Sequence, residues 1–114
     1  MAAVYVNNIV VNAGSNFSQS FTLEGSDTNS AFNLTGYTVA AQMRKWSGSS
    51  SVITFTTEIV YPATNGNILL QLTDSQTANI KPGRYVYDVV ITDVDLAKNR
   101  VIEGMVLVRE GVTR

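Results

Sequence analysis

Apolar side chains recur at every second position in several stretches of this sequence, and this alternation constrains the fold more than any other feature. Phe17, Phe21 and Leu23 take odd positions between hydroxyl side chains, and the stretch from Tyr37 to Met43 alternates in the same way. A period of two places apolar side chains on one face of a β-strand, whereas a helix needs them three and four positions apart. No stripe of the second kind persists for three turns. The chain is therefore predicted to be all-β.

The spacing of strands and turns predicts the architecture. The expected strands span residues 4–11, 17–23, 37–44, 52–61, 68–72, 84–92 and 100–109. About seven to eight short strands separated by turn signals are typical of a two-sheet antiparallel β-sandwich of the immunoglobulin-like kind. An open barrel is the alternative. A chain of 114 residues fits one domain, so residues 1–114 are expected to form a single sandwich.

Two connections carry residues that predict their local geometry. Asn65 and Gly66 readily supply the positive φ of a hairpin turn, so the strands on either side should pair antiparallel. Thr73 and Asp74 are both suitable N-cap residues, which predicts one helical turn before Pro82 ends it.

The stretch "KPGRYVYDVVIT", residues 81–92, begins as a turn and continues as a strand. Its Gly83-Arg84-Tyr85 start has the pattern of a tyrosine corner, in which the hydroxyl of a Tyr early in a late strand bonds to upstream backbone. If Tyr85 and Tyr87 face the core, Asp88 faces outward. Asp88 is therefore predicted to be a hydrogen-bonding residue at the surface or in an interface.

The composition argues against catalysis. The sequence contains no His and no Cys, which removes the commonest general base and metal ligand and excludes disulfides and thiolate metal sites. Neither a Ser-x-x-Lys pair nor a glycine-rich phosphate motif occurs. We expect a protein that is not an enzyme, with no catalytic residue, no bound metal and no cofactor.

The charge distribution narrows the choice of partner. Eight basic and nine acidic residues leave a formal charge of −1, so no overall field attracts nucleic acid or an anionic membrane. The apolar N-terminus lacks the positive region of a signal peptide, and no stretch approaches the roughly 18–20 apolar residues of a membrane helix. Residues 1–43 hold two acids and no base. Such an uncharged region suits a contact with protein better than one with nucleic acid or membrane.

Both ends of the chain carry predicted strands with little polar face. In residues 4–11 apolar side chains occupy both faces, and a strand that is apolar on both faces needs to be covered on both. One reading is an external partner, such as a second copy of the chain. The other is a strand tucked between the sheet and the C-terminal tail of the same chain. The interface candidates are Val4, Tyr5, Val6, Ile9, Val10, Met105 and Leu107.

Two further clusters have both a functional and a structural interpretation. Arg44, Lys45 and Trp46 could stack on a base or a sugar, or they could end a strand with the indole packed over the end of the sandwich and the charges in solvent. The loop at residues 93–99 contains two Asp and one Asn. It lacks the ligand spacing of an EF-hand, and a hydrated hairpin tip explains these residues better than a looser calcium site.

Three segments carry a resemblance to a known family: "LTGYTVAAQMR", "KPGRYVYDVVITD" and "RVIEGMVLVREGVTR". With them the chain resembles small virion structural proteins of tailed bacteriophages, particularly T4-like phages of marine cyanobacteria. It is also similar to the N-terminal domain of phage upper baseplate proteins, from about Gly14 onward. In those proteins further domains follow, whereas this sequence ends at Arg114. This departure favours a freestanding decoration or connector protein over a baseplate role.

The resemblance implies a function. The expected protein is a non-enzymatic virion component of the head, neck, tail or baseplate, made in the host cytoplasm and assembled into the particle. Its expected partners are itself and other virion proteins, reached through the terminal strands as a homo-oligomer or on a lattice. The alternative function is a carbohydrate-binding or host-adhesion sandwich that uses Trp46, Lys45 and the loop at residues 93–99.

Overall fold

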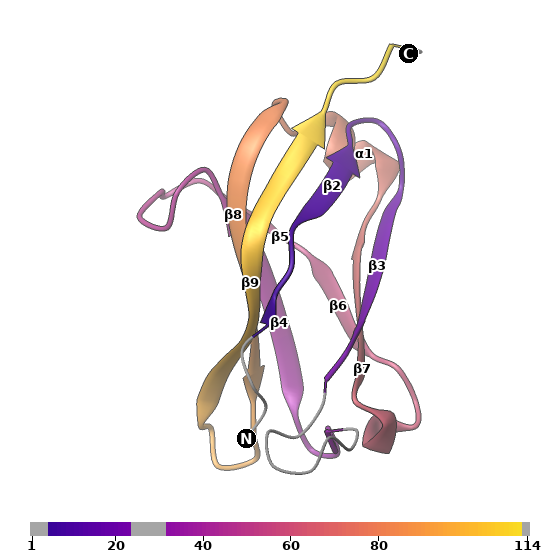
Figure 1. The fold of residues 1–114 in the computed structure, drawn as a ribbon, viewed down its shortest axis with the longest axis vertical. Helices are drawn as coiled ribbons and strands as arrows, with labels where there is room; N and C mark the ends of the chain where they lie inside the picture. Colours follow the sequence, from indigo (N-terminus) through magenta and orange to yellow (C-terminus); the bar gives the residue numbers. More distant parts are fainter. Residues whose placement is uncertain (1–4, 24–31, 113–114) are drawn as a thin grey trace.

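The computed structural model describes residues 5–23 and 32–112, and over these ranges the chain is an all-β sandwich with one short α-helix (Figure 1). The larger sheet contains β1 (Tyr5–Val6), β2 (Ile9–Asn12), β4 (Thr38–Arg44), β5 (Val52–Thr54), β8 (Gly83–Thr92) and β9 (Lys98–Arg109). The smaller sheet contains β3 (Phe17–Thr22), β6 (Thr56–Ile59) and β7 (Asn67–Leu72). The predicted sandwich is confirmed. The described residues form nine strands because the first and fourth predicted strands are each divided in two.

The strand order identifies the kind of sandwich. The larger sheet runs β1-β9-β8-β4-β5, with β2 also on β9, and the smaller sheet runs β3-β7-β6. β1 and β2 lie parallel to β9, whereas the other strand pairs of the described residues are antiparallel. The predicted antiparallel sandwich therefore includes a parallel pairing at the N-terminal strand. A parallel neighbour needs a long connection, which the intervening chain supplies. This arrangement of two sheets is immunoglobulin-like.

Alternating side chains fill the space between the sheets. In β8 the residues from Tyr85 to Ile91 at odd positions are buried, and the even positions between them are more exposed. The same alternation buries Phe17 and Phe21 of β3. The most deeply buried side chains are Leu23, Leu34, Met43, Ile68, Leu70, Ile91, Ile102, Val11, Val89, Val101, Val106 and Val108.

The two predicted local motifs are present. The Tyr85 hydroxyl donates to the Lys81 carbonyl oxygen at 2.7 Å, which confirms the tyrosine corner. Thr73 is the N-cap of α1 (Asp74–Ala78), and its hydroxyl accepts from the amide of Gln76. The Gln76 side chain in turn accepts from the Thr73 amide at 2.8 Å, completing a capping box. In the described residues, α1 and the turn η1 (Ala63–Asn65) are far too short to cross a bilayer.

Phe55 divides the predicted fourth strand between the two sheets. Before it, β5 pairs with β4; after it, β6 pairs antiparallel with β7. The hairpin across Asn65 and Gly66 is therefore confirmed for β6, but the prediction that residues 52–61 form one strand is wrong. Phe55 is buried, and its ring lies 5.9 Å from that of Phe17 and 6.3 Å from that of Tyr87. The chain changes sheets at a side chain that fills the core between them.

Asn7 and Asn8 interrupt the N-terminal strand between β1 and β2, where it runs alongside β9. The amide of Asn7 donates to the Glu103 carbonyl at 2.9 Å, and the side-chain oxygen of Asn8 accepts from the Met105 amide at 3.0 Å. The Tyr87 hydroxyl donates to the Asn7 carbonyl at 2.5 Å. The polar groups of this interruption are thereby bonded to β8 and β9, and β2 resumes the same register along β9.

Gly104 permits the backbone of Asn7 to lie this close to β9. A Cβ at this position would lie 2.2 Å from the Asn7 carbonyl oxygen and 2.8 Å from its carbon. Any side chain would therefore push the N-terminal strand away from β9. The register of β8 and β9 also shifts between Val89 and Val90, which leaves Val101 as an extra residue in β9. This β-bulge explains why Val101 and Ile102 are both buried although they are adjacent.

Replacement of Gly104 tests the close approach of the Asn7 backbone to β9. Gly104→Ala is expected to destabilise the protein by about 1–3 kcal/mol, because the added Cβ collides with backbone that cannot move alone. Urea unfolding followed by circular dichroism measures the effect. Gly48→Ala is the matched control, since its Cβ would meet nothing closer than the Trp46 ring at 3.4 Å. Equal stability of the two variants would contradict the close contact described between Asn7 and Gly104.

Burial raises the pKa of the Tyr87 hydroxyl to about 12, from an ordinary value of 10.0. Because the folded protein holds this proton more tightly than the unfolded chain, the associated stability is complete below pH 10 and is lost as the pH rises toward 12. Tyr87→Phe should lose about 0.5–1.5 kcal/mol at neutral pH with the hydrogen bond to Asn7. Its free energy of unfolding should then fall less steeply than that of the wild type above pH 10. Urea unfolding of the wild type and the variant at several pH values from 10 to 12 provides the measurement. An equal decline of the free energy of unfolding with pH in both proteins would refute the raised pKa of Tyr87.

Candidate binding surface on the larger sheet

Strand register places apolar side chains in rows across the outer face of the larger sheet. In one row Val10 of β2 is paired with Leu107 of β9, which is paired on its other side with Arg84 of β8. In the next row Met105 of β9 is paired with Val86 of β8. Paired residues on one face of a sheet lie side by side, so these apolar side chains form a continuous surface.

We call Val10, Val86, Met105 and Leu107 the outer apolar patch. Val10 and Met105 are each 48% exposed, and Leu107 is 42% exposed. Val6 lies near its margin and is 77% exposed. The patch is outside the core, because the inward faces of the same strands already fill the sandwich. Its exposure is thus available for a partner.

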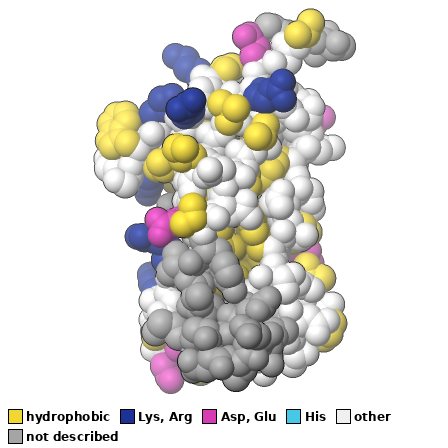
Figure 2. Space-filling model, viewed as in Figure 1, with side chains coloured by type: hydrophobic (Ala, Val, Ile, Leu, Met, Phe, Trp, Pro, Cys, Tyr) yellow, Lys and Arg dark blue, Asp and Glu magenta, His cyan; other side chains and the backbone are white. Residues whose placement is uncertain are grey.

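Basic side chains border the upper end of this surface. Figure 2 shows Lys and Arg side chains interspersed with hydrophobic ones there. Arg84 shares a row with Leu107, and Arg109 follows two positions later on β9. The Lys45 ammonium lies 4.9 Å from the centroid of the Tyr85 ring, a cation–π contact at the same end of β8.

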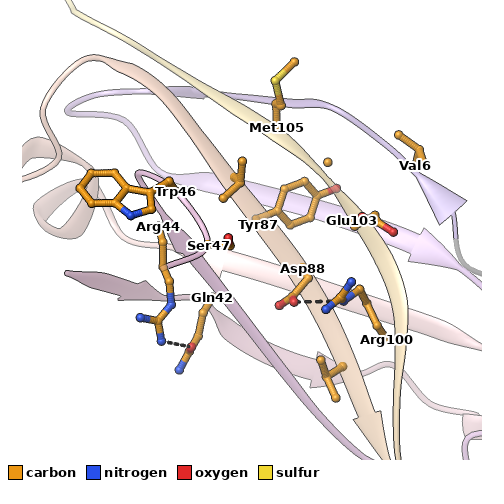
Figure 3. Close-up of a pocket in the computed structure, with 13 residues that line it drawn as sticks. Val6, Gln42, Arg44, Trp46, Ser47, Tyr87, Asp88, Arg100, Glu103 and Met105 are labelled. Atoms are coloured by element: carbon orange, nitrogen blue, oxygen red, sulfur yellow. Dashed lines mark hydrogen bonds and ion pairs between the residues drawn. The ribbon is translucent and has the colours of Figure 1, made fainter. Parts of the chain in front are cut away.

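A groove of about 1010 Å³ overlaps the patch on this face, since Val86 and Met105 belong to both. Figure 3 shows Trp46 on one side of it and Val6 on the other, with β8 and β9 between them. Its floor includes the third row of the sheet, in which Glu103 of β9 is paired with Asp88 of β8, and Asp88 with Gln42 of β4. Polar side chains in this row therefore replace the apolar ones of the rows above.

The Trp46 side of the groove is held in place by backbone and side-chain hydrogen bonds. The Ser49 amide donates to the Trp46 carbonyl at 2.9 Å, which closes a turn after β4. The Arg44 guanidinium donates to the Ser49 carbonyl, and its other terminal nitrogen donates to the Gln42 side chain at 3.3 Å. Trp46 is 62% exposed on this pinned turn. The predicted alternative of an indole packed over the end of the sandwich is therefore wrong.

Asp88 lies in the groove and pairs with Arg100. The Arg100 Nε lies 3.3 Å from Asp88 Oδ2, and the two side chains are 56% and 40% exposed respectively. The predicted outward orientation of Asp88 is confirmed. The pairing itself was not predicted, because a β-bulge sets Arg100 rather than Val101 opposite Val90. Cross-strand register, which the sequence does not display, brings Gln42, Glu103 and Arg100 beside Asp88.

The other predicted site residues fall into three groups. Val6, Val10, Met105 and Leu107 are exposed on the outer face, but Ile9 is only 5% exposed and packs into the core. Ile9 is thus not available for an interface, because β2 turns alternate side chains inward. Val4 and the side chain of Tyr5 lie outside what the structure describes.

The two parts of the predicted glycan site do not come together. Trp46 lines the groove, whereas Lys45 is not among the lining residues and covers Tyr85 instead. The β8–β9 connection is residues 93–97, because Lys98 and Asn99 of the predicted loop belong to β9, and none of residues 93–99 lines the groove. Its Asp93 carboxylate accepts from the amides of Asp95 and Ala97 at 2.9 and 3.0 Å, which confirms a turn role for Asp93.

The chain matches no family model and no curated protein sequence. Its fold is similar to that of a mutant of the SrpA adhesin from Streptococcus sanguinis, with a TM-score of 0.53 and 11% identity over 96% of this chain. A Listeria monocytogenes internalin-like protein gives a TM-score of 0.43 and 13% identity over 95% of this chain. This chain spans 57% and 28% of those two chains. The likeness to the adhesin shows a shared β-sandwich fold.

Loss of the Asp88 charge should have little effect on stability. Asp88→Asn keeps the shape and removes a partly exposed ion pair, and such pairs contribute about 0.2–1 kcal/mol. We therefore expect the free energy of unfolding to fall by less than about 1 kcal/mol. Urea unfolding at low and high salt provides the measurement. A much larger loss would mean that the Asp88 side chain is not at the surface.

Proposed function

We propose that this protein is a non-enzymatic structural protein of a bacteriophage virion, and that it assembles through the outer face of its larger sheet. The outer apolar patch is the observation that carries the proposal. Val10 and Leu107 are paired neighbours on the two terminal strands, and both are substantially exposed. Partner binding would remove these side chains from water, which is favourable by roughly 25 cal/mol for each Å² of apolar surface.

The terminal strands contribute to assembly through one face only. Ile9 and Val11 of β2 point into the core, and Val106 and Val108 of β9 do the same. The pairing of β2 with β9 also occupies one edge of each strand. The proposed contact is therefore made by side chains of the sheet face. The occupants we propose are other copies of the chain and neighbouring virion proteins.

The sequence resemblance supports the virion context, and the fold accounts for the residues that carry it. Tyr85 forms the tyrosine corner, Tyr87 bonds to the N-terminal strand, and Gly104 allows that strand to approach. These are structural roles, as expected for a family that shares a fold. The sandwich is also found in the SrpA adhesin.

The residue content agrees with a role without catalysis. The sequence has no His or Cys to act as base, nucleophile or soft metal ligand. The polar groups of the groove include a carboxylate paired with a guanidinium at 3.3 Å, with Gln42 and Glu103 beside them, and also Arg44, Ser47 and Tyr87. Such a set binds through hydrogen bonds and does not include an activated nucleophile.

A charge placed in the patch tests the proposed assembly. Leu107→Asp should weaken self-association by about tenfold or more, because a carboxylate would be buried against apolar side chains. Sedimentation velocity over a range of concentrations measures this, and binding to virions that lack the protein measures the contact with other subunits. Leu107 is 42% exposed, so the variant should remain folded.

Val94→Asp is the matched control, since it puts the same charge on an exposed Val of the β8–β9 loop, away from the patch. It should associate as the wild type does. A wild-type protein that stays monomeric at high concentration and also fails to bind such virions would refute the proposal.

A further inference from the structure

We infer that the groove beside Trp46 is a binding site for a neutral saccharide. This role does not depend on the assembly proposed above, although the groove and the outer apolar patch share Val86 and Met105. The groove combines an exposed indole with several planar polar side chains, and these are the two kinds of group that a sugar ring needs. Its C–H faces are apolar, while its hydroxyl groups both donate and accept hydrogen bonds.

Trp46 supplies the apolar platform. Its indole is 62% exposed although Trp has more apolar surface to hide than any other residue here. The turn that carries it is closed by the Ser49 amide and bound by the Arg44 guanidinium. Because these bonds fix the backbone of the turn before binding, less of its conformational entropy is lost when a ligand stacks on the indole. The geometry is therefore that of a prepared surface.

The polar row of the groove can hold adjacent hydroxyl groups. The ion pair uses Asp88 Oδ2 and Arg100 Nε, and both side chains remain partly exposed. A carboxylate accepts through two oxygens and a guanidinium donates through three nitrogens, so each has further capacity on the side facing the groove. Vicinal hydroxyls of a sugar can donate to such a carboxylate and accept from such a guanidinium.

The balance of charge favours a neutral ligand. Arg44 and Arg100 supply two positive charges to the groove, and Asp88 and Glu103 supply two negative charges. Two minus two leaves no net charge, so an acidic sugar or a phosphate backbone would gain no attraction from the site as a whole. Lys45, the next cation along the chain, is directed to the Tyr85 ring. A neutral polyhydroxyl compound fits this set best.

The backbone of the groove excludes the common way in which a sheet binds a peptide. β8 lies between β4 and β9 and is paired with both, so its amide and carbonyl groups are already used. Addition of a peptide strand needs a free sheet edge, which the floor of the groove does not offer. A ligand here is held by side chains alone, as saccharides commonly are.

The experiment uses the single Trp of the sequence as its reporter. A glycan array that carries neutral oligosaccharides of glucose, galactose and mannose beside sialylated ones identifies the ligand with the purified full-length protein. Titration with the same oligosaccharide, followed by Trp fluorescence, then measures affinity. We expect saturable binding to a neutral glycan with a change in the emission of Trp46.

Two substitutions in the groove test the roles of its parts. Trp46→Ala should weaken binding by about tenfold or more, because the stacking surface is removed. Asp88→Asn should weaken it by about threefold or more, because a charged acceptor becomes a neutral one. Thermal unfolding within a few degrees of the wild type confirms that both variants are folded.

Three control variants separate this site from other surfaces. Tyr61→Ala removes another exposed aromatic ring, and Lys45→Ala removes the cation beside Trp46 that does not line the groove. Both should bind the glycan as the wild type does. Leu107→Asp, which is also outside the lining, should keep glycan binding while it loses self-association. Failure of one proposal is thus distinguishable from failure of the other.

Four outcomes would overturn the inference. The first is an array without a neutral ligand, together with unchanged Trp46 emission at millimolar oligosaccharide. The second is binding that survives Trp46→Ala undiminished. The third is binding of sialylated glycans only, which contradicts the charge argument. The fourth is a change in Trp46 emission produced by a peptide library and by no sugar.

Discussion

The parallel pairing of the N-terminal strand with β9 determines which apolar side chains this protein buries and which it presents. Because β2 lies along β9 in register, Ile9 and Val11 enter the core while Val10 stands beside Leu107 on the outer face. The pairing depends on a close approach of the Asn7 backbone to Gly104, where the Asn7 carbonyl accepts a hydrogen bond from the Tyr87 hydroxyl. Without this close approach the core would lose Ile9 and Val11, and the outer apolar patch would lose Val10.

The outer face is divided by row into two chemical surfaces. Leu107 and Met105 present apolar side chains in two successive rows that end at Arg84 and Arg44, and the next row contains Asp88 and Glu103. Since side chains alternate along a strand, each two-residue step along β9 moves one row down the same face. A surface for protein contact and a polar groove can therefore lie side by side on one rigid sheet. The hydrogen-bonded turn that carries Trp46 forms one side of the groove.

Local features were predictable wherever their cause lies within a few residues. The tyrosine corner of Tyr85 and the capping box of Thr73 join residues that are four and three positions apart, so the pattern contains both partners. The outward orientation of Asp88 followed from alternation alone. By contrast, Trp46 is exposed on a turn to which Arg44 donates a hydrogen bond at the Ser49 carbonyl, and no pattern of residue types predicts the direction of such a turn.

Contacts between distant segments were the part that residue patterns did not predict. The change of sheet at Phe55 places its ring between those of Phe17 and Tyr87, residues far from it in the chain. The bulge at Val101 determines that Arg100 meets Asp88. Each depends on register, and a shift of one residue in register would be invisible in the composition of either strand.

The sequence by itself determined an all-β sandwich, a core made of alternate side chains, and two terminal strands with too many apolar residues for one buried face. The tertiary structure alone decided that the first strand lies parallel to the last and that Ile9 is inside while Val10 is outside. The physical reason is that alternation specifies two faces for each strand but not its neighbour. The neighbour is chosen by packing and hydrogen bonds across the whole chain, here at Gly104 and Asn7.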